Sequence, residues 1–73
     1  MSATYTVIVE RPSAGESWSA MCPDLSVFAT GDSRDHVVAQ IREAIDFHLE
    51  VLREDGLPIP EPSSSVVQVT VAA

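Results

Sequence analysis

Lysine is absent from this chain, and cysteine occurs only once, at Cys22. A single thiol excludes a disulfide within the chain, and it excludes a zinc site built from paired cysteines. Uninterrupted apolar runs are four residues long or fewer, which is too short to span a membrane. The first residues lack the basic stretch and apolar run of a signal peptide. These absences predict a cytoplasmic protein that uses no metal and no other cofactor.

Positive charge is scarce as well, because four arginines stand against 11 acidic residues and the net charge is −7. The arginines are scattered, and each has an acidic residue close by in the sequence. Proteins that bind nucleic acids neutralise phosphates with lysine and arginine, so direct nucleic-acid binding by this chain is not expected. The acidic surface either keeps the protein soluble or meets a basic protein partner, whose association it would accelerate.

The composition is that of a folded protein, with 45% hydrophobic and 21% charged residues. With 73 residues, the chain is expected to form one domain over residues 1–73, without a separate DNA-binding domain. A chain of this length buries only about 60% of the surface that it exposes when unfolded, so its core is small. Small cores often depend on support from a partner chain.

Three segments in the first half of the chain have the two-residue period of strands. Residues 4–11, 17–22 and 25–30 alternate in polarity and are rich in side chains that favour strands. Turn-forming residues separate these segments at 12–15 and at Pro23 and Asp24. The sequence therefore predicts three consecutive antiparallel strands joined by short turns.

The period then changes to that of an α-helix. From residue 34 to residue 55, apolar side chains recur at spacings of three and four, which places them on one stripe of a helix. Asp32 or Ser33 supplies the N-cap, Gly56 follows as a left-handed C-cap, and Pro58 prevents continuation. After a proline-rich stretch, the valines of residues 66–71 predict a last strand.

These elements predict an α+β fold of order β-β-β-α-β. Connection rules place the last strand parallel to the first and beside it, in a four-stranded mixed sheet of order 3-2-1-4 with the long helix on one face. The other face is bare and carries either Ile8 or the set of Tyr5, Val7 and Val9, depending on the register. An apolar bare face predicts a homodimer or homotetramer, formed through that face or through an outer strand edge.

Few residues in the sequence suggest chemistry. Glu10, Asp24 and Asp46 are the acids that a magnesium-dependent nuclease of RNase H-like fold would use, but only the analogy of fold supports this role. Glu43, Asp46 and Glu50 line one face of the predicted helix, as the acids of a solvated outer face do without any function. Cys22 has acidic neighbours, so its thiol is expected to be a small buried apolar group. His48 lies at the border of the apolar stripe, and no nucleophile is assigned to it. We therefore expect no catalytic residue.

Two aromatic side chains lie on the predicted strands. Trp18 and Phe28 are either core residues or anchors for a partner, because one helix leaves one sheet face without cover. Together with Asp24, at the turn between their strands, they are the predicted partner-contact residues.

Four motifs, in this order along the chain, resemble those of the HicB-like antitoxin family. They are Trp-Ser-Ala-Met-Cys-Pro-Asp-Leu at 18–25, Thr-Gly-Asp-Ser at 30–33, Glu-Ala-Ile at 43–45 and Gly-Leu-Pro-Ile-Pro-Glu-Pro at 56–62. The resemblance covers residues 4–71 and implies a partial RNase H-like fold with dimeric or higher assembly. The chain departs from the family pattern at residues 26–28, which read Ser-Val-Phe where Pro-Gly-Cys is usual. A C-terminal DNA-binding segment, which many members carry, is not expected in this chain.

The resemblance further implies that the chain binds and blocks a HicA-type toxin, a small basic ribonuclease that cleaves mRNA. The net charge of −7 agrees with this role, because an acidic protein is suited to cover a basic one. The alternative is a standalone homo-oligomeric regulatory or scaffold domain without a toxin. The third hypothesis is the magnesium-dependent nuclease.

Overall fold

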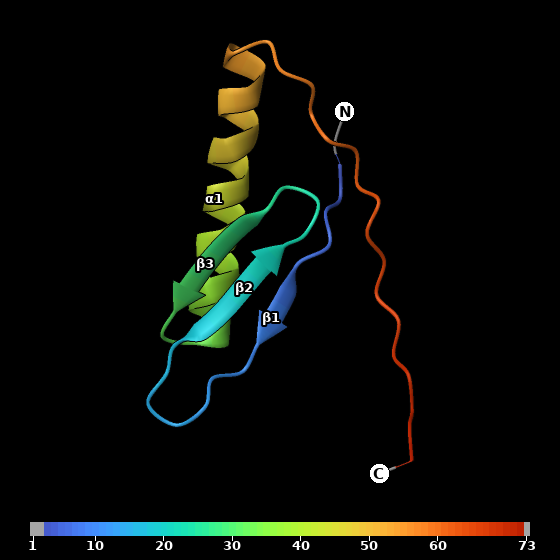
Figure 1. The fold of residues 1–73 in the computed structure, drawn as a ribbon. Coiled ribbons are helices and arrows are strands. Elements are labelled where there is room, and N and C mark those ends of the chain that lie inside the picture. Colours follow the sequence, from blue (N-terminus) through green and yellow to red (C-terminus); the bar gives the residue numbers. More distant parts are fainter. Residues whose placement is uncertain (1–2, 73) are drawn as a thin grey trace.

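A three-stranded antiparallel sheet carries one long helix on one of its faces (Figure 1). The structure is a computed structural model that describes residues 3–72. Its elements are β1 (Ile8–Glu10), β2 (Trp18–Cys22), β3 (Val27–Gly31) and α1 (Arg34–Glu54), and the strand order is β1-β2-β3. The predicted α+β class, the meander of three strands and the helix after it are confirmed.

The sheet register decides which side chains face α1. In β2, Ala20 and Cys22 are buried, whereas Met21 between them is exposed on the opposite face. In β1, Val9 pairs with Ala20 and packs against the core, whereas Ile8 pairs with Met21. Of the two alternatives that the sequence left open, Ile8 is therefore the β1 residue on the bare face.

The first turn of α1 is fixed by side chains at its start. Ser33 is the N-cap, and its hydroxyl oxygen accepts a hydrogen bond of 3.0 Å from the His36 N–H. The Asp32 backbone N–H donates a second hydrogen bond, of 3.1 Å, to His36 Nδ1. Asp35, in the first turn, places negative charge near the positive end of the helix dipole. Of the two predicted N-cap residues, the structure uses Ser33.

The end of α1 is closed by backbone hydrogen bonds around a glycine. Gly56 has a φ of +68°, the left-handed conformation that favours glycine at this position. Its N–H donates to the Arg53 carbonyl at 3.1 Å, and the Leu57 N–H donates to the Leu52 carbonyl at 2.9 Å. The predicted left-handed cap at Gly56 is confirmed. No helix in the part of the chain that the structure describes is long and apolar enough to cross a membrane.

The core lies where the first turns of α1 cross the sheet. Val37 and Ile41 pack against Ala20 and are almost completely buried. Gly31, at the end of β3, allows this close approach, because a Cβ there would lie only 2.8 Å from the Val37 backbone nitrogen. Cys22 is also fully buried, as predicted for an inert thiol. This small core stabilises only one face of the sheet.

The predicted fourth strand is not formed among the described residues, so the sheet is neither four-stranded nor mixed, and the order 3-2-1-4 is absent. Residues 66–71 run beside β1 in the same direction but remain apart from it (Figure 1). A strand needs a backbone partner, and within residues 3–72 no backbone hydrogen bond joins 66–71 to β1. The valines of this segment are 71–80% exposed.

We expect Ile41→Ala to lower the free energy of unfolding by about 2–5 kcal/mol, because it leaves a cavity between α1 and β2. Urea denaturation followed by circular dichroism measures this change. Phe47→Ala is the matched control on α1, since Phe47 is 70% exposed. It should change the free energy by no more than about 0.5 kcal/mol. Equal effects of the two substitutions would contradict the packing of α1 described above.

Candidate partner-binding surfaces

An apolar row crosses the bare face of the sheet. Met21, on the central strand, pairs with Ile8 of β1 on one side and with Phe28 of β3 on the other. Directly paired residues in antiparallel strands have neighbouring side chains on the same face. Ile8, Met21 and Phe28 are 42%, 42% and 64% exposed. The three side chains, called the sheet-face row below, form a continuous apolar strip that no element of the chain covers within residues 3–72.

The next row on this face is polar and carries a single charge. Ser19 pairs with Glu10 on one side and with Thr30 on the other, so this row holds two hydroxyls and one carboxylate. The acidic residues of α1 lie instead on exposed positions of the helix, behind the sheet, at Asp35, Glu43, Asp46, Glu50 and Glu54. The same helix also carries three of the four arginines, Arg34, Arg42 and Arg53, so its net charge is only −2. The bare sheet face, in contrast, is mainly apolar and hydroxylic.

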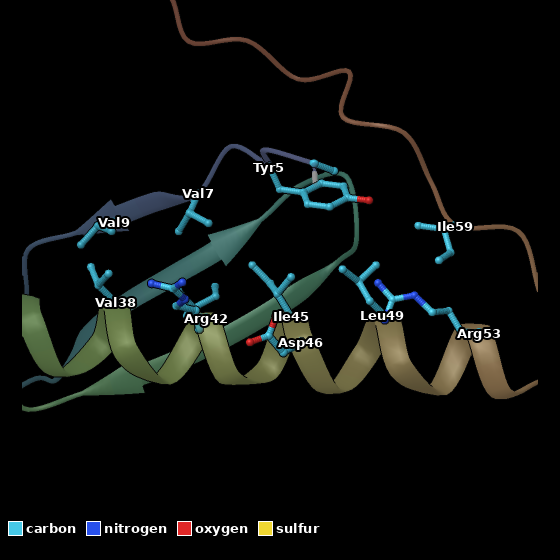
Figure 2. A pocket seen from close by; sticks show the side chains of 12 residues that line it. Tyr5, Val7, Val9, Val38, Arg42, Ile45, Asp46, Leu49, Arg53 and Ile59 are labelled. Atoms are coloured by element: carbon cyan, nitrogen blue, oxygen red, sulfur yellow. The ribbon is translucent and has the colours of Figure 1, made fainter. Parts of the chain in front are cut away.

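An open groove of about 790 Å³ separates β1 from α1. It exists because α1 packs mainly against β3 and β2 and much less against β1. Figure 2 shows Tyr5, Val7 and Val9 facing the helix across the groove, with Ile59 beyond the end at Tyr5. The helix side of the groove is formed by apolar and charged side chains together, namely Val38, Ile45, Leu49, Arg42, Asp46 and Arg53.

Asp24 is positioned by a tight turn between β2 and β3. The Leu25 N–H donates to the Cys22 carbonyl at 3.3 Å, which closes a four-residue turn with Pro23 and Asp24 at its centre. Proline presets the backbone angle of the first central position, and aspartate is frequent in turns. The turn directs the Asp24 carboxylate towards the segment that follows the prolines.

The Asp24 carboxylate accepts hydrogen bonds from two consecutive serines. Its Oδ1 accepts from the hydroxyls of Ser64 at 2.8 Å and Ser63 at 3.0 Å. Its Oδ2 accepts from the backbone N–H groups of Ser63 at 3.1 Å and Ser64 at 3.3 Å. These hydrogen bonds, that from the Ser64 hydroxyl above all, lower the pKa of Asp24 below its ordinary value, although desolvation opposes them.

Two residues that precede β1 hold the same segment. The Thr6 hydroxyl donates to the Ser64 carbonyl at 3.1 Å, and the Tyr5 hydroxyl donates to the Pro60 carbonyl. With Asp24, these contacts tie residues 60–64 to the start of β1 and to the β2–β3 turn. The valines beyond them are left exposed.

The structure does not bring the three predicted partner contacts together. Phe28 lies in the sheet-face row and is exposed, whereas Trp18 is partly buried and packs against the core on the helix side. Asp24 lies in the turn beyond the other end of β2, where its carboxylate binds Ser63 and Ser64. The contact of these residues with a partner stays a prediction, and Phe28 exposes the most apolar surface of the three.

The acids proposed for a nuclease lie on separate elements. Glu10 is on the bare face of the sheet, Asp24 is in the β2–β3 turn and Asp46 is on α1, behind the sheet. Within residues 3–72, no group of three or more His, Cys, Asp or Glu side chains is placed to hold a metal ion. His48 is only partly buried.

Comparison with known protein families identifies the chain. A family model described as a HicB-like antitoxin of bacterial toxin–antitoxin systems matches residues 5–72. The chain belongs to this family. No curated protein and no solved structure matches it significantly. As a HicB-like antitoxin, the chain is expected to act by binding a toxin rather than by catalysis, and the match includes all three strands, α1 and the segment held by Asp24.

Two features of this HicB-like chain were not predicted from its sequence. The sheet-face row depends on the pairing of three strands, and the binding of Ser63 and Ser64 by Asp24 joins residues 39 and 40 positions apart. The only local signal for the second feature is the run of three serines after Pro62, since serine hydroxyls readily bind carboxylates.

Acid should release the segment held by Asp24. Because its folded-state pKa lies below the ordinary value of 3.8, ionised Asp24 stabilises the folded state above that pH, and this contribution is lost as the pH falls through the folded pKa. We expect the amide NMR signals of Ser63 and Ser64 to shift in this range. In Asp24→Ala, no side-chain acceptor remains, so these signals should stay at the released position at every pH. If the Ser63 and Ser64 signals of this variant at neutral pH equal those of the wild type, the assigned hydrogen bonds are wrong.

Proposed function

We propose that this HicB-like chain is an antitoxin that acts in the cytoplasm, where it binds and blocks a small basic HicA-type toxin that cleaves mRNA. The observation that carries this proposal is the family match over residues 5–72. A toxin that cleaves RNA must attract phosphate groups and therefore carries basic surface. The net charge of −7, without a single lysine, suits a protein that covers such a surface.

The exposed acids of α1 provide a surface for the first encounter with this toxin. Asp46 and Glu50 are one helical turn apart, and Glu43 lies one turn before Asp46, so their charges act from neighbouring positions. Charge of opposite sign raises the rate of association between two proteins by about 10- to 1000-fold at low salt. Arg42 and Arg53 lie near Asp46 on the same helix, so part of this effect is cancelled.

Self-association is the second part of the proposal, as a homodimer or homotetramer. The surfaces that support it are the bare sheet face and the free edge of β1, both of which leave apolar side chains in water. Trp18, Asp24 and Phe28 are the proposed partner contacts, and of these Phe28 lies on the bare face. The same surfaces would serve the alternative function, a homo-oligomeric regulatory or scaffold domain without a toxin.

The family resemblance also supports a larger sheet than the three strands described. We propose that residues 66–71 can add to β1 as a fourth strand, which completes a partial RNase H-like fold of order 3-2-1-4. The segment already runs beside β1 in the same direction (Figure 1), held at Ser64 by Thr6 and Asp24. In this arrangement, Val66 would face α1, because Val66 and Gln68 already line one hollow with Val7 and Val9. Val67, Val69 and Val71 would then lie on the bare face.

We expect toxin binding to depend on the charge of α1. The test measures association with a purified HicA-type toxin, and inhibition of its RNA cleavage, for the wild type and for the triple variant E43Q, D46N, E50Q. The variant should associate about 10-fold more slowly at low salt, and the difference should shrink as salt screens the charges. Glu10→Gln, on the sheet face, is the matched control. Absence of binding by the wild type at low salt would contradict the antitoxin function for that pair.

The fourth strand predicts a difference between two valines of similar present exposure. Val66→Asp should lower the free energy of unfolding by about 1.5–3 kcal/mol, because it replaces an apolar side chain that packs on the helix side of the sheet. Val69→Asp, which alternation places on the bare face, should have a much smaller effect. Denaturation of both variants in urea measures the difference. If neither variant changes the free energy, residues 66–71 stay outside the sheet.

A further inference from the structure

The sheet-face row has a geometry that is suited to pairing with itself. Met21 lies at its centre on β2. Ile8 lies on the neighbouring strand on one side, and Phe28 lies on the neighbouring strand on the other side. A twofold axis that runs over Met21, parallel to β2, would place Met21 opposite Met21 of a second copy. It would also place Ile8 of each copy opposite Phe28 of the other. Contacts of this reciprocal kind define an isologous interface.

The sizes of the side chains favour this axis over one that runs along the row. An axis along the row would set Phe28 against Phe28 at one end and Ile8 against Ile8 at the other, so the two sheets would be forced apart at one end only. An axis parallel to β2 combines a large side chain with a smaller one at both ends. The spacing of about 10 Å between packed sheets can then be uniform.

The distribution of charge indicates which partner fits this face. Two copies that each carry −7 repel one another, so the face with the fewest acids is the one at which they can approach most easily. The bare face carries one carboxylate beside the row, Glu10, and the twofold axis sets it opposite Thr30 rather than opposite a second Glu10. Pairing through the sheet faces leaves both α1 helices on the outside, at the largest separation.

From these observations we propose that the bare sheet face binds a second copy of this chain, with Ile8 and Phe28 in reciprocal contact about a twofold axis over Met21. The inference rests on the self-association proposed above and assigns it to one surface. It also separates two tasks in the molecule. The sheet faces join two copies, and the acidic α1 surfaces of the dimer remain free for a basic protein partner.

Charge substitutions at the two ends of the row test this arrangement. Sedimentation equilibrium should give about twice the monomer mass of 7.8 kDa for the wild type. The variants I8K and F28E should each associate about 10-fold or more weakly, because each buries a charge without a partner. An equimolar mixture of I8K and F28E should recover dimers, since the two new charges face each other only in the heterodimer. Phe47→Glu is the matched control, because Phe47 is an exposed residue of α1, and this variant should remain dimeric.

The possible results distinguish between two proposals, namely that the chain self-associates and that it does so through the bare sheet face. A wild type that is monomeric at high micromolar concentration overturns both. Dimers that persist in I8K and F28E overturn this surface but leave self-association standing, through another face or edge. Loss of dimers in both variants without recovery in the mixture overturns the twofold pairing of Ile8 with Phe28. Circular dichroism confirms that each variant is folded, and toxin binding measured on the same variants tests the antitoxin function independently.

Discussion

One helix can bury only one face of a sheet, and the rest of this structure follows from that constraint. Val37 and Ile41 of α1 close the core against Ala20, and Gly31 allows the backbones to approach. Because α1 lies over β2 and β3, it leaves a groove beside β1 and leaves the opposite sheet face without cover. In a chain of 73 residues there is no second helix among the described elements to fill either place.

The uncovered surfaces differ in chemical character, and this difference connects the fold to the antitoxin function. Alternation along each strand sends Ala20 and Cys22 to the core and Met21 to the bare face, with Ile8 and Phe28 beside it. The helix sends its apolar stripe inward and its acids outward. One side of the molecule is therefore suited to apolar contact, whereas the other side carries exposed charges of both signs.

Asp24 has a structural role that could not be predicted from its position in a turn. By accepting hydrogen bonds from Ser63 and Ser64, it holds the segment after α1 near the start of β1. The valines that follow lie beside β1 without pairing with it. A carboxylate that is already engaged within the chain is less available to a partner, so Phe28 is the better supported of the two as a partner contact.

The amino-acid pattern alone predicted the three strands, the helix with its C-cap at Gly56, and the likeness to HicB-like antitoxins, which the family match confirms. For the N-cap it left Asp32 and Ser33 open, and the structure uses Ser33. Such features depend on side chains a few positions apart, where periodicity and turn chemistry act directly. The folded arrangement was needed to show that Ile8 lies on the bare face, that Asp24 holds Ser63 and Ser64, and that residues 66–71 lie outside the sheet. Alternation could not choose between the faces of β1, because Tyr5, Val7, Val9 and Ile8 are all apolar. The valines of 66–71 predicted a strand, but a strand needs a backbone partner, and whether one is met depends on contacts with residues far away in the chain.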